Sequence, residues 1–170
     1  ELTSKNARIV CELAGRDDLF VFAGCKTPII RPLITAEHVH GKTGLDGPVL
    51  PEPKMPLQDM NGVDFIIETL KVHEANSITL CCLGPLTNIA VAIQKEPEIL
   101  SKLKEIIMMA GAYFEVGNIT PTAEFNIYVD PEAAQIVLNS PIKKTLLPLD
   151  VTHKILVTSD KIQEFKNFGS

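Results

Sequence analysis

The sequence predicts an α/β fold in which helices cover both faces of a mostly parallel sheet. Apolar runs of strand length alternate along the chain with segments of helical periodicity, which is typical of βαβ units. The chain has 170 residues, of which 45% are hydrophobic and 22% are charged. This length and composition suit a globular domain with its own core, so we expect residues 1–170 to form a single domain.

The first predicted element is a helix that Thr3 or Ser4 caps and that ends at Gly15. Its apolar face would carry Ile9, Val10 and Leu13. Residues 19–23 form an apolar run that predicts a buried strand. A turn-rich excursion over residues 24–62 follows. It is longer than an ordinary connection, so we expect it either to carry function or to be partly mobile.

Strands and helices alternate in the rest of the chain. Apolar runs predict strands over residues 78–83, 106–110 and 145–149. Helical spacing predicts helices over residues 63–72, 88–94 and 159–168. In the first of these helices the spacing runs through Phe65, Ile66, Leu70 and Val72. Asp130 and Pro131 start another helix, because an aspartate caps free backbone N–H groups and a proline at that position needs none.

Charge and hydropathy exclude several classes of partner. The net charge is -5 and the sequence pI is about 5.4, so the chain lacks the basic footprint of a protein that binds nucleic acid or an anionic membrane. No apolar run approaches the roughly 20 residues that span a bilayer. We therefore expect neither nucleic acid nor membrane as a partner.

The four cysteines follow no metal-ligand spacing. Cys81 and Cys82 are neighbours within the run 78–83, so we expect both to be buried core thiols in a strand. Free thiols favour a reducing compartment, and we expect a cytoplasmic protein. The chain starts at Glu1 and stops at Ser170, just after a helical pattern, so we expect both ends to be cuts within a longer sequence.

A polar loop before the helix at Asp130 is the strongest candidate for a binding site. It follows the strand 106–110, and loops at the carboxyl ends of strands are where open α/β sheets bind ligands. Its side chains are mostly uncharged donors and acceptors, with one acid: Asn118, Thr120, Thr122, Glu124 and Asn126. Such a loop suits a polyhydroxylated ligand such as a sugar better than a phosphate.

The segment 124–126 has two interpretations. If it is extended, Glu124 and Asn126 point to one side and grip hydroxyls while Phe125 packs on the other. Otherwise it is a solvated turn with one apolar anchor. Asp150, at the end of the last strand, either lines the same crevice or caps the next turn.

Two further candidates lie elsewhere in the chain. The turn after the strand 78–83 either holds a helix cap at Thr87 or Asn88, or exposes main-chain carbonyls such as that of Leu83 to a hard cation like Ca²⁺. His38 and His40 lack the partners of a zinc site. Two interpretations remain. Either one of these histidines faces a pocket, as a proton donor or a contact to a base, or both are ordinary surface histidines.

Taken together, these motifs resemble the nucleoside hydrolases, the inosine–uridine-preferring nucleoside N-ribohydrolases. Their order and spacing match across nearly the whole chain, although each motif alone is weakly specific. The matching segments are residues 39–45, 83–90, 96–99, 109–112, 117–126, 130–134 and 149–152.

The resemblance implies a Rossmann-like α/β fold and hydrolysis of the N-glycosidic bond of a nucleoside to ribose and free base. In that family Ca²⁺ holds the attacking water and ribose hydroxyls, and an aspartate is the general base. By the same resemblance, Leu83 gives a main-chain carbonyl to calcium and His40 lies near the base. The positions that match ribose-binding residues are Met109, Asn118, Glu124 and Asn126.

The family's aspartate-rich motif, Asp-x-Asp-x-Gly-x-Asp-Asp, has no counterpart in these 170 residues. Asp17 and Asp18 precede a strand without the spaced acids and glycine. A later His-Asp segment that gives the last metal carboxylate is also absent. We therefore expect an incomplete domain that holds ribose, lacks most calcium carboxylates and is inactive alone.

Two alternatives remain open. One is a non-catalytic module that binds a nucleoside or ribose. The other is an oligomerisation module, because a missing central strand leaves an unpaired edge that invites pairing with a second copy.

Overall fold

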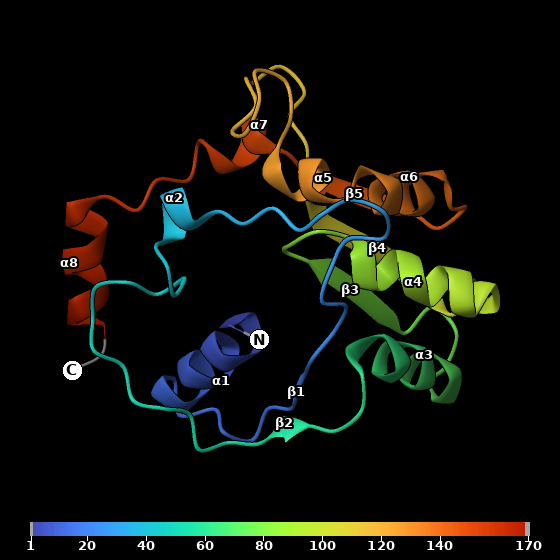
Figure 1. The fold of residues 1–170 in the computed structure, drawn as a ribbon, viewed down its shortest axis with the longest axis horizontal. Coiled ribbons are helices and arrows are strands. Elements are labelled where there is room, and N and C mark those ends of the chain that lie inside the picture. Colours follow the sequence, from blue (N-terminus) through green and yellow to red (C-terminus); the bar gives the residue numbers. More distant parts are fainter. Residues whose placement is uncertain (1, 169–170) are drawn as a thin grey trace.

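Residues 2–168 are described by a computed structural model, which arranges them as two parallel sheets with helices packed around them (Figure 1). The strand β1 (Val21–Phe22) pairs with β2 (Leu57–Gln58). The larger sheet has the order β3 (Ile78–Cys82), β4 (Leu103–Met109) and β5 (Lys144–Leu147). Every pairing is parallel, which confirms the predicted α/β class.

The core lies between the larger sheet and three helices. These are α3 (Gly62–Val72), α4 (Thr87–Lys95) and α6 (Pro131–Asn139), with the short 3₁₀ helix η1 (Pro97–Ser101) beside them. Alternation along β4 turns Ile106 and Met108 into this core, where neither is exposed to solvent. Burying a side chain of this size stabilises the fold by about 1.5–3 kcal/mol. The core therefore fixes the strand and helix ends that carry the candidate site.

The amino-terminal elements depart from the prediction. The helix α1 (Leu2–Leu13) contains Thr3 and Ser4 within its first turn, so neither caps it from outside as expected. Of its predicted apolar face, Ile9 is buried but Val10 and Leu13 are exposed. The strand expected over 19–23 is reduced to β1, and it is not buried. The physical reason is that β1 pairs only with the two-residue β2, whose small sheet has too little cover to bury whole side chains.

The excursion over 24–62 contains two short elements, α2 (Glu37–His40) and β2. Its end is tied back to β1, because the Gly62 N–H donates to the Ala23 carbonyl at 2.7 Å. Asn61 then caps α3 by accepting from the Val63 N–H at 2.9 Å. Phe65 of α3 stacks on Phe22 of β1 with ring centroids 3.9 Å apart.

The face of α3 differs from the predicted one. Val63, Ile67 and Leu70 are its buried residues, whereas Val72 is exposed. Among the side chains of the predicted apolar face, Leu70 lies in the core and Ile66 packs against the core. Phe65 instead stacks on Phe22. The helix is amphipathic as expected, but its buried stripe is rotated.

The cysteine prediction is wrong for Cys81, which is exposed. The β-strand alternation sends Ile78, Leu80 and Cys82 to the helix-covered face, and Cys81 to the opposite face. Burial raises the pKa of the Cys82 thiol to about 11. Cys11, Cys25, Cys81 and Cys82 are all free thiols, and Cys82 is partly buried.

The remaining elements lie at the carboxyl ends of the strands or outside the core. They are α5 (Phe125–Val129), α7 (Leu149–Thr152) and α8 (Ser159–Asn167). Leu149 belongs to α7 and not to the strand expected over 145–149. The helix α8 stands apart from the sheets (Figure 1) and buries none of its residues. Between residues 2 and 168, no helix is both long enough and apolar enough to cross a membrane.

Candidate functional site

Three of the predicted site residues meet at the carboxyl end of β4. Met109 is the last residue of β4, Glu124 immediately precedes α5, and Asn126 lies in its first turn. The Asn126 Nδ2 group donates to the Met109 carbonyl at 3.0 Å and lies 3.3 Å from its Sδ atom. The sequence positions 109, 124 and 126 therefore form one contiguous cluster.

The Glu124 carboxylate is buried, with 2% of the residue exposed. Its Oε1 atom accepts from the Asn126 N–H at 2.9 Å, and its Oε2 atom accepts from the Gly111 N–H at 3.2 Å. Both donors are backbone groups, one from the start of α5 and one from the turn after β4. The carboxylate thereby joins the two segments that frame the cluster.

The segment 124–126 is not extended, which corrects the strand-like interpretation. Glu124 has extended backbone angles and caps α5, whereas Phe125 and Asn126 are already helical. The cap explains this: a side-chain oxygen that satisfies the first free N–H groups favours a helix start at that point. Glu124 and Asn126 converge through the helix cap, and not through strand alternation.

In the loop over residues 117–124, polar side chains predicted to bind a ligand instead hydrogen-bond to the backbone of the loop and of the start of α5. The Asn118 Oδ1 atom accepts from the Phe125 N–H at 2.8 Å. The Thr120 Oγ1 atom accepts from the Ala123 N–H at 2.9 Å. A Cβ atom at Gly117 would overlap the backbone of Thr120 and Ala123, so this tight loop requires glycine. Asn118 is exposed beside the cluster and positions the start of α5.

His40 and Leu83 lie outside this hydrogen-bonded cluster. His40 is an exposed residue at the end of α2, which Figure 1 shows on a different segment from α5. Leu83 follows β3 and is 82% exposed. The described residues contain no group of three or more His, Cys, Asp or Glu side chains placed to hold a metal ion.

Asp150 organises the segment between the cluster and α7. Its carboxylate accepts from three successive backbone N–H groups, those of Tyr113 at 2.8 Å, Phe114 at 2.8 Å and Glu115 at 3.2 Å. These N–H donors, that of Tyr113 most strongly, hold the pKa of Asp150 below the usual aspartate value. Asp150 therefore holds the turn after β4, which is not the turn following Asp150 that the sequence suggested. The rings it positions, Tyr113 and Phe114, are 80% and 89% exposed and meet edge to face.

Asp130 has partners that the sequence analysis missed. It caps α6 as predicted, with its Oδ1 atom accepting from the Ala133 N–H at 3.0 Å. Its Oδ2 atom also accepts from the Thr87 hydroxyl at 2.7 Å and from the Ile29 N–H at 3.0 Å. Thr87 therefore faces Asp130 and does not cap α4. No local signal predicts these contacts, because the partners are 43 and 101 residues away.

Asn88, the other expected cap of α4, is likewise used elsewhere. Its Oδ1 atom accepts from the Cys25 N–H at 2.7 Å. The cap position of α4 falls on Leu86, which makes no side-chain cap. Asn88 thus binds the excursion and Thr87 binds Asp130. The prediction that one of them caps α4 is therefore wrong.

This parallel sheet, with a polar cluster at the carboxyl end of a central strand, is the architecture of a ligand-binding α/β protein. Residues 1–170 match the family described as inosine-uridine preferring nucleoside hydrolase, so the chain belongs to that family. Over all 170 residues it is 42% identical to the pyrimidine-specific ribonucleoside hydrolase RihA of Escherichia fergusonii, covering 54% of that protein. It is 52% identical over 161 residues to an uncharacterized protein of Schizosaccharomyces pombe, covering 52% of it.

Solved structures with the same fold are also nucleoside hydrolases by name. A purine-preferring ribonucleoside hydrolase from Gardnerella vaginalis superposes with a TM-score of 0.89 at 30% identity, over 96% of this chain and 52% of that one. The plant nucleoside hydrolase PpNRh1 gives a TM-score of 0.86 at 33% identity, with the same coverage. This chain spans about half the length of the curated relatives it matches.

Proposed function

We propose that this chain supplies the ribose-holding part of a nucleoside hydrolase, an enzyme that cleaves the N-glycosidic bond to release ribose and free base. The observation that carries the proposal is the convergence of Met109, Glu124 and Asn126 at the carboxyl end of β4. Such a cluster, rich in neutral groups and holding one carboxylate, is suited to hydroxyl groups of a sugar.

The cluster has acceptor capacity left for a ligand. An ionised carboxylate has about four lone-pair sites, and backbone N–H groups occupy two of those on Glu124. The Asn126 amide nitrogen is turned to Met109, and within residues 2–168 no hydrogen bond to its Oδ1 atom is found. We propose that Glu124 and Asn126 accept hydrogen bonds from ribose hydroxyls, with Asn118 and Met109 at the edge of the same site.

The proposal concerns ribose and leaves the base unassigned. The relatives named above include a pyrimidine-specific and a purine-preferring enzyme, which is what shared sugar contacts and different base contacts would give. We propose His40 as a contact near the base. Leu83 would contribute one main-chain oxygen to the calcium ion of a complete family site.

We also propose that these 170 residues alone do not hydrolyse nucleosides. They contain no Asp-x-Asp-x-Gly-x-Asp-Asp motif to supply a general base and calcium carboxylates. The test is release of ribose from inosine and uridine by the purified chain, with and without Ca²⁺. We expect no release above background, and robust Ca²⁺-dependent release would contradict the proposal.

Binding is tested separately, by calorimetry with ribose and with nucleosides. We expect wild-type chain to bind and Glu124→Ala to lose binding, because that variant removes the buried acceptor. Glu98→Ala, an exposed acid in η1, is the matched control and should bind as wild type does. Absence of binding by wild-type chain, together with concentration-dependent mass, would instead support an oligomerisation module.

Three broader features belong to the same proposal. We place residues 1–170 within one domain and the protein in the cytoplasm, where free thiols such as those of Cys11 and Cys82 persist. We propose a small nucleoside as the partner, and neither nucleic acid nor membrane. The acidic net charge of -5 supports this choice.

A further inference from the structure

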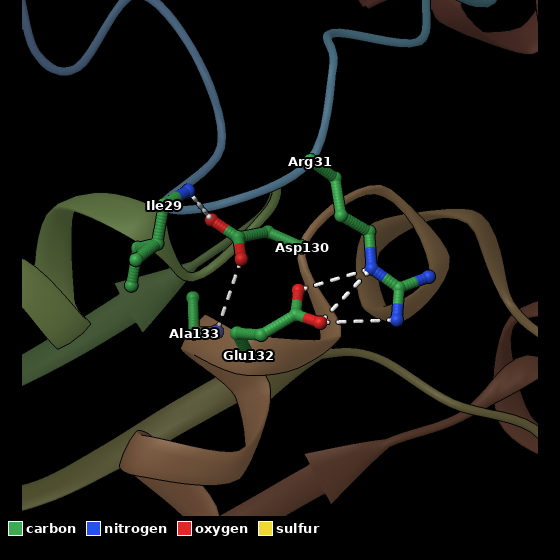
Figure 2. A network of polar contacts seen from close by, with 5 residues as sticks. All are labelled: Ile29, Arg31, Asp130, Glu132 and Ala133. Atoms are coloured by element: carbon green, nitrogen blue, oxygen red, sulfur yellow. Dashed lines mark hydrogen bonds and ion pairs between the residues drawn. The ribbon is translucent and has the colours of Figure 1, made fainter.

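Among the buried acids of the described residues, Asp130 accepts the most hydrogen bonds. None of the residue is exposed, and its carboxylate accepts from the Thr87 hydroxyl. It also accepts from the backbone N–H groups of Ile29 and Ala133 (Figure 2). A helix cap needs only the bond from Ala133. The bonds from Ile29 and Thr87 therefore serve another purpose, and both reach segments distant in sequence.

The Ile29 bond belongs to a set of contacts that hold residues 24–31, here called the strap. At one end of the strap the Cys25 N–H donates to Asn88 Oδ1 at 2.7 Å. At the other end Arg31 pairs with Glu132 at 3.0 Å (Figure 2). A Cβ atom at Gly24 would overlap the Asn88 side chain, so the strap backbone lies directly against α4. The strap is thus tied to the first turns of α4 and α6.

These first turns lie at the carboxyl ends of β3 and β4, which is the side of the sheet that carries Glu124 and Asn126. Asp130 itself directly follows α5, whose other end holds Glu124 and Asn126. One carboxylate therefore connects the strap, the amino end of α4 and the helix that bears the ribose-binding residues. Among the three ties, the Ile29 bond is the one that is partly buried, because the Cys25–Asn88 bond and the Arg31–Glu132 pair are exposed. Exposed ion pairs contribute little to stability.

We propose that Asp130 is a positioning residue: it latches the strap beside the ribose-binding cluster and thereby sets the affinity for a nucleoside. The inference rests on the proposed function for its ligand, and on the geometry of Asp130 for the latch. It assigns Asp130 no contact with the ligand. Its effect passes through the strap and α5.

The variant Asp130→Asn separates the latch from the helix cap. Asparagine caps helices as well as aspartate does, so its oxygen can still accept from Ala133. Its NH₂ group can donate to the Thr87 hydroxyl, but it cannot accept from the Ile29 N–H. Thr87→Val is the matched control, because it removes the third partner and leaves the Ile29 bond in place.

The first readout is hydrogen exchange in the full chain without ligand. In Asp130→Asn we expect the Ile29 amide to exchange about tenfold faster, since a bond to a charged acceptor is lost. The Ala133 amide should exchange as in wild type, and Thr87→Val should leave Ile29 protected. Unchanged protection of Ile29 in Asp130→Asn would overturn the latch.

The second readout is calorimetry with inosine and uridine. We expect Asp130→Asn to weaken nucleoside binding about tenfold and Thr87→Val to leave it unchanged. A released strap with unchanged affinity would reduce Asp130 to a structural residue and overturn its positioning role. If wild-type chain binds neither nucleoside, the proposed function and the affinity role fail together, and exchange at Ile29 still decides the latch by itself.

Discussion

Buried Glu124 is the residue on which both the local fold and the proposed chemistry depend. A carboxylate taken out of water is destabilising unless hydrogen bonds replace its hydration. Here the replacement comes from two backbone N–H groups, those of Gly111 and Asn126. The same bonds aim the carboxylate at the carboxyl end of β4, so removing the charge should affect stability and binding together.

We expect Glu124→Gln to lose about 1–3 kcal/mol of unfolding free energy, because a glutamine offers one oxygen and turns its NH₂ group toward a backbone donor. The measurement is chemical denaturation followed by circular dichroism. Glu98→Gln, on the exposed face of η1, should change stability by less than about 0.5 kcal/mol. Equal effects of the two substitutions would contradict the role of Glu124.

Gly117→Ala should destabilise the loop before α5 by about 1–3 kcal/mol, because its Cβ would overlap backbone atoms that cannot give way cheaply. The matched control is Gly84→Ala, where a Cβ meets nothing within 4 Å. Thermal unfolding of both variants is the measurement. A midpoint for Gly117→Ala as high as that for Gly84→Ala would show that the loop tolerates a side chain.

At the scale of elements, the helix α7 and the turn after β4 stabilise each other. The Leu149 N–H donates to the Gly111 carbonyl at 2.9 Å, and Asp150 accepts from the backbone of residues 113–115. His153 lies 3.5 Å from Glu115 and adds an ion pair when it is protonated. The turn that bears Tyr113 and Phe114 is therefore held from α7 as well as from β4.

This arrangement gives the turn a defined pH dependence. The folded-state pKa of Asp150 lies below its unfolded value, so its stabilising effect is present above the ordinary aspartate pKa. It is lost as the pH falls through the lowered folded-state pKa. We expect the Tyr113 and Phe114 amide chemical shifts to titrate in that acidic range. The shifts should titrate likewise in His153→Gln but not in Asp150→Asn; persistence in Asp150→Asn would assign the titration to another acid.

At the scale of the whole molecule, the larger sheet is covered unevenly. The helices α3, α4 and α6 bury one face, whereas Cys81 on the opposite face is exposed. In the described chain β3 and β5 are the edges of this sheet, and an uncovered edge strand offers unpaired N–H and C=O groups. Away from the sheets, α8 also exposes apolar side chains such as Phe165.

We therefore expect the purified 170-residue chain either to associate or to have a low thermal unfolding midpoint. Light scattering under reducing conditions should show a mass that rises with concentration. Cys81→Lys should reduce the association, because a lysine on β3 opposes strand pairing and apolar contact. Glu98→Lys, away from that face, should not. A monomer with a sharp, high thermal transition would contradict this expectation.

Much of the fold and the class of site could be predicted from the sequence. Periodicity located α3, α4, β3 and β4 to within a few residues, because side-chain burial between sheet and helices imposes a local repeat. It located α8 as well, although that helix buries none of its residues. The cap at Asp130 was also readable, since an aspartate before a proline acts on its own helix. The prediction of a buried strand over residues 19–23 was wrong, because only the two-residue strand β2 pairs with this run and too little of the protein covers it.

What the sequence by itself determined is therefore the alternation of elements, the family and the set of polar residues at the carboxyl end of β4. Only the tertiary structure decided how those residues are used. It tied Glu124 to Gly111 in the turn after β4, directed Thr87 and Asn88 away from their own helix, and made Asp130 the link between the strap and α5. The physical reason is that hydrogen bonds between residues far apart in the chain leave no periodic trace in the sequence.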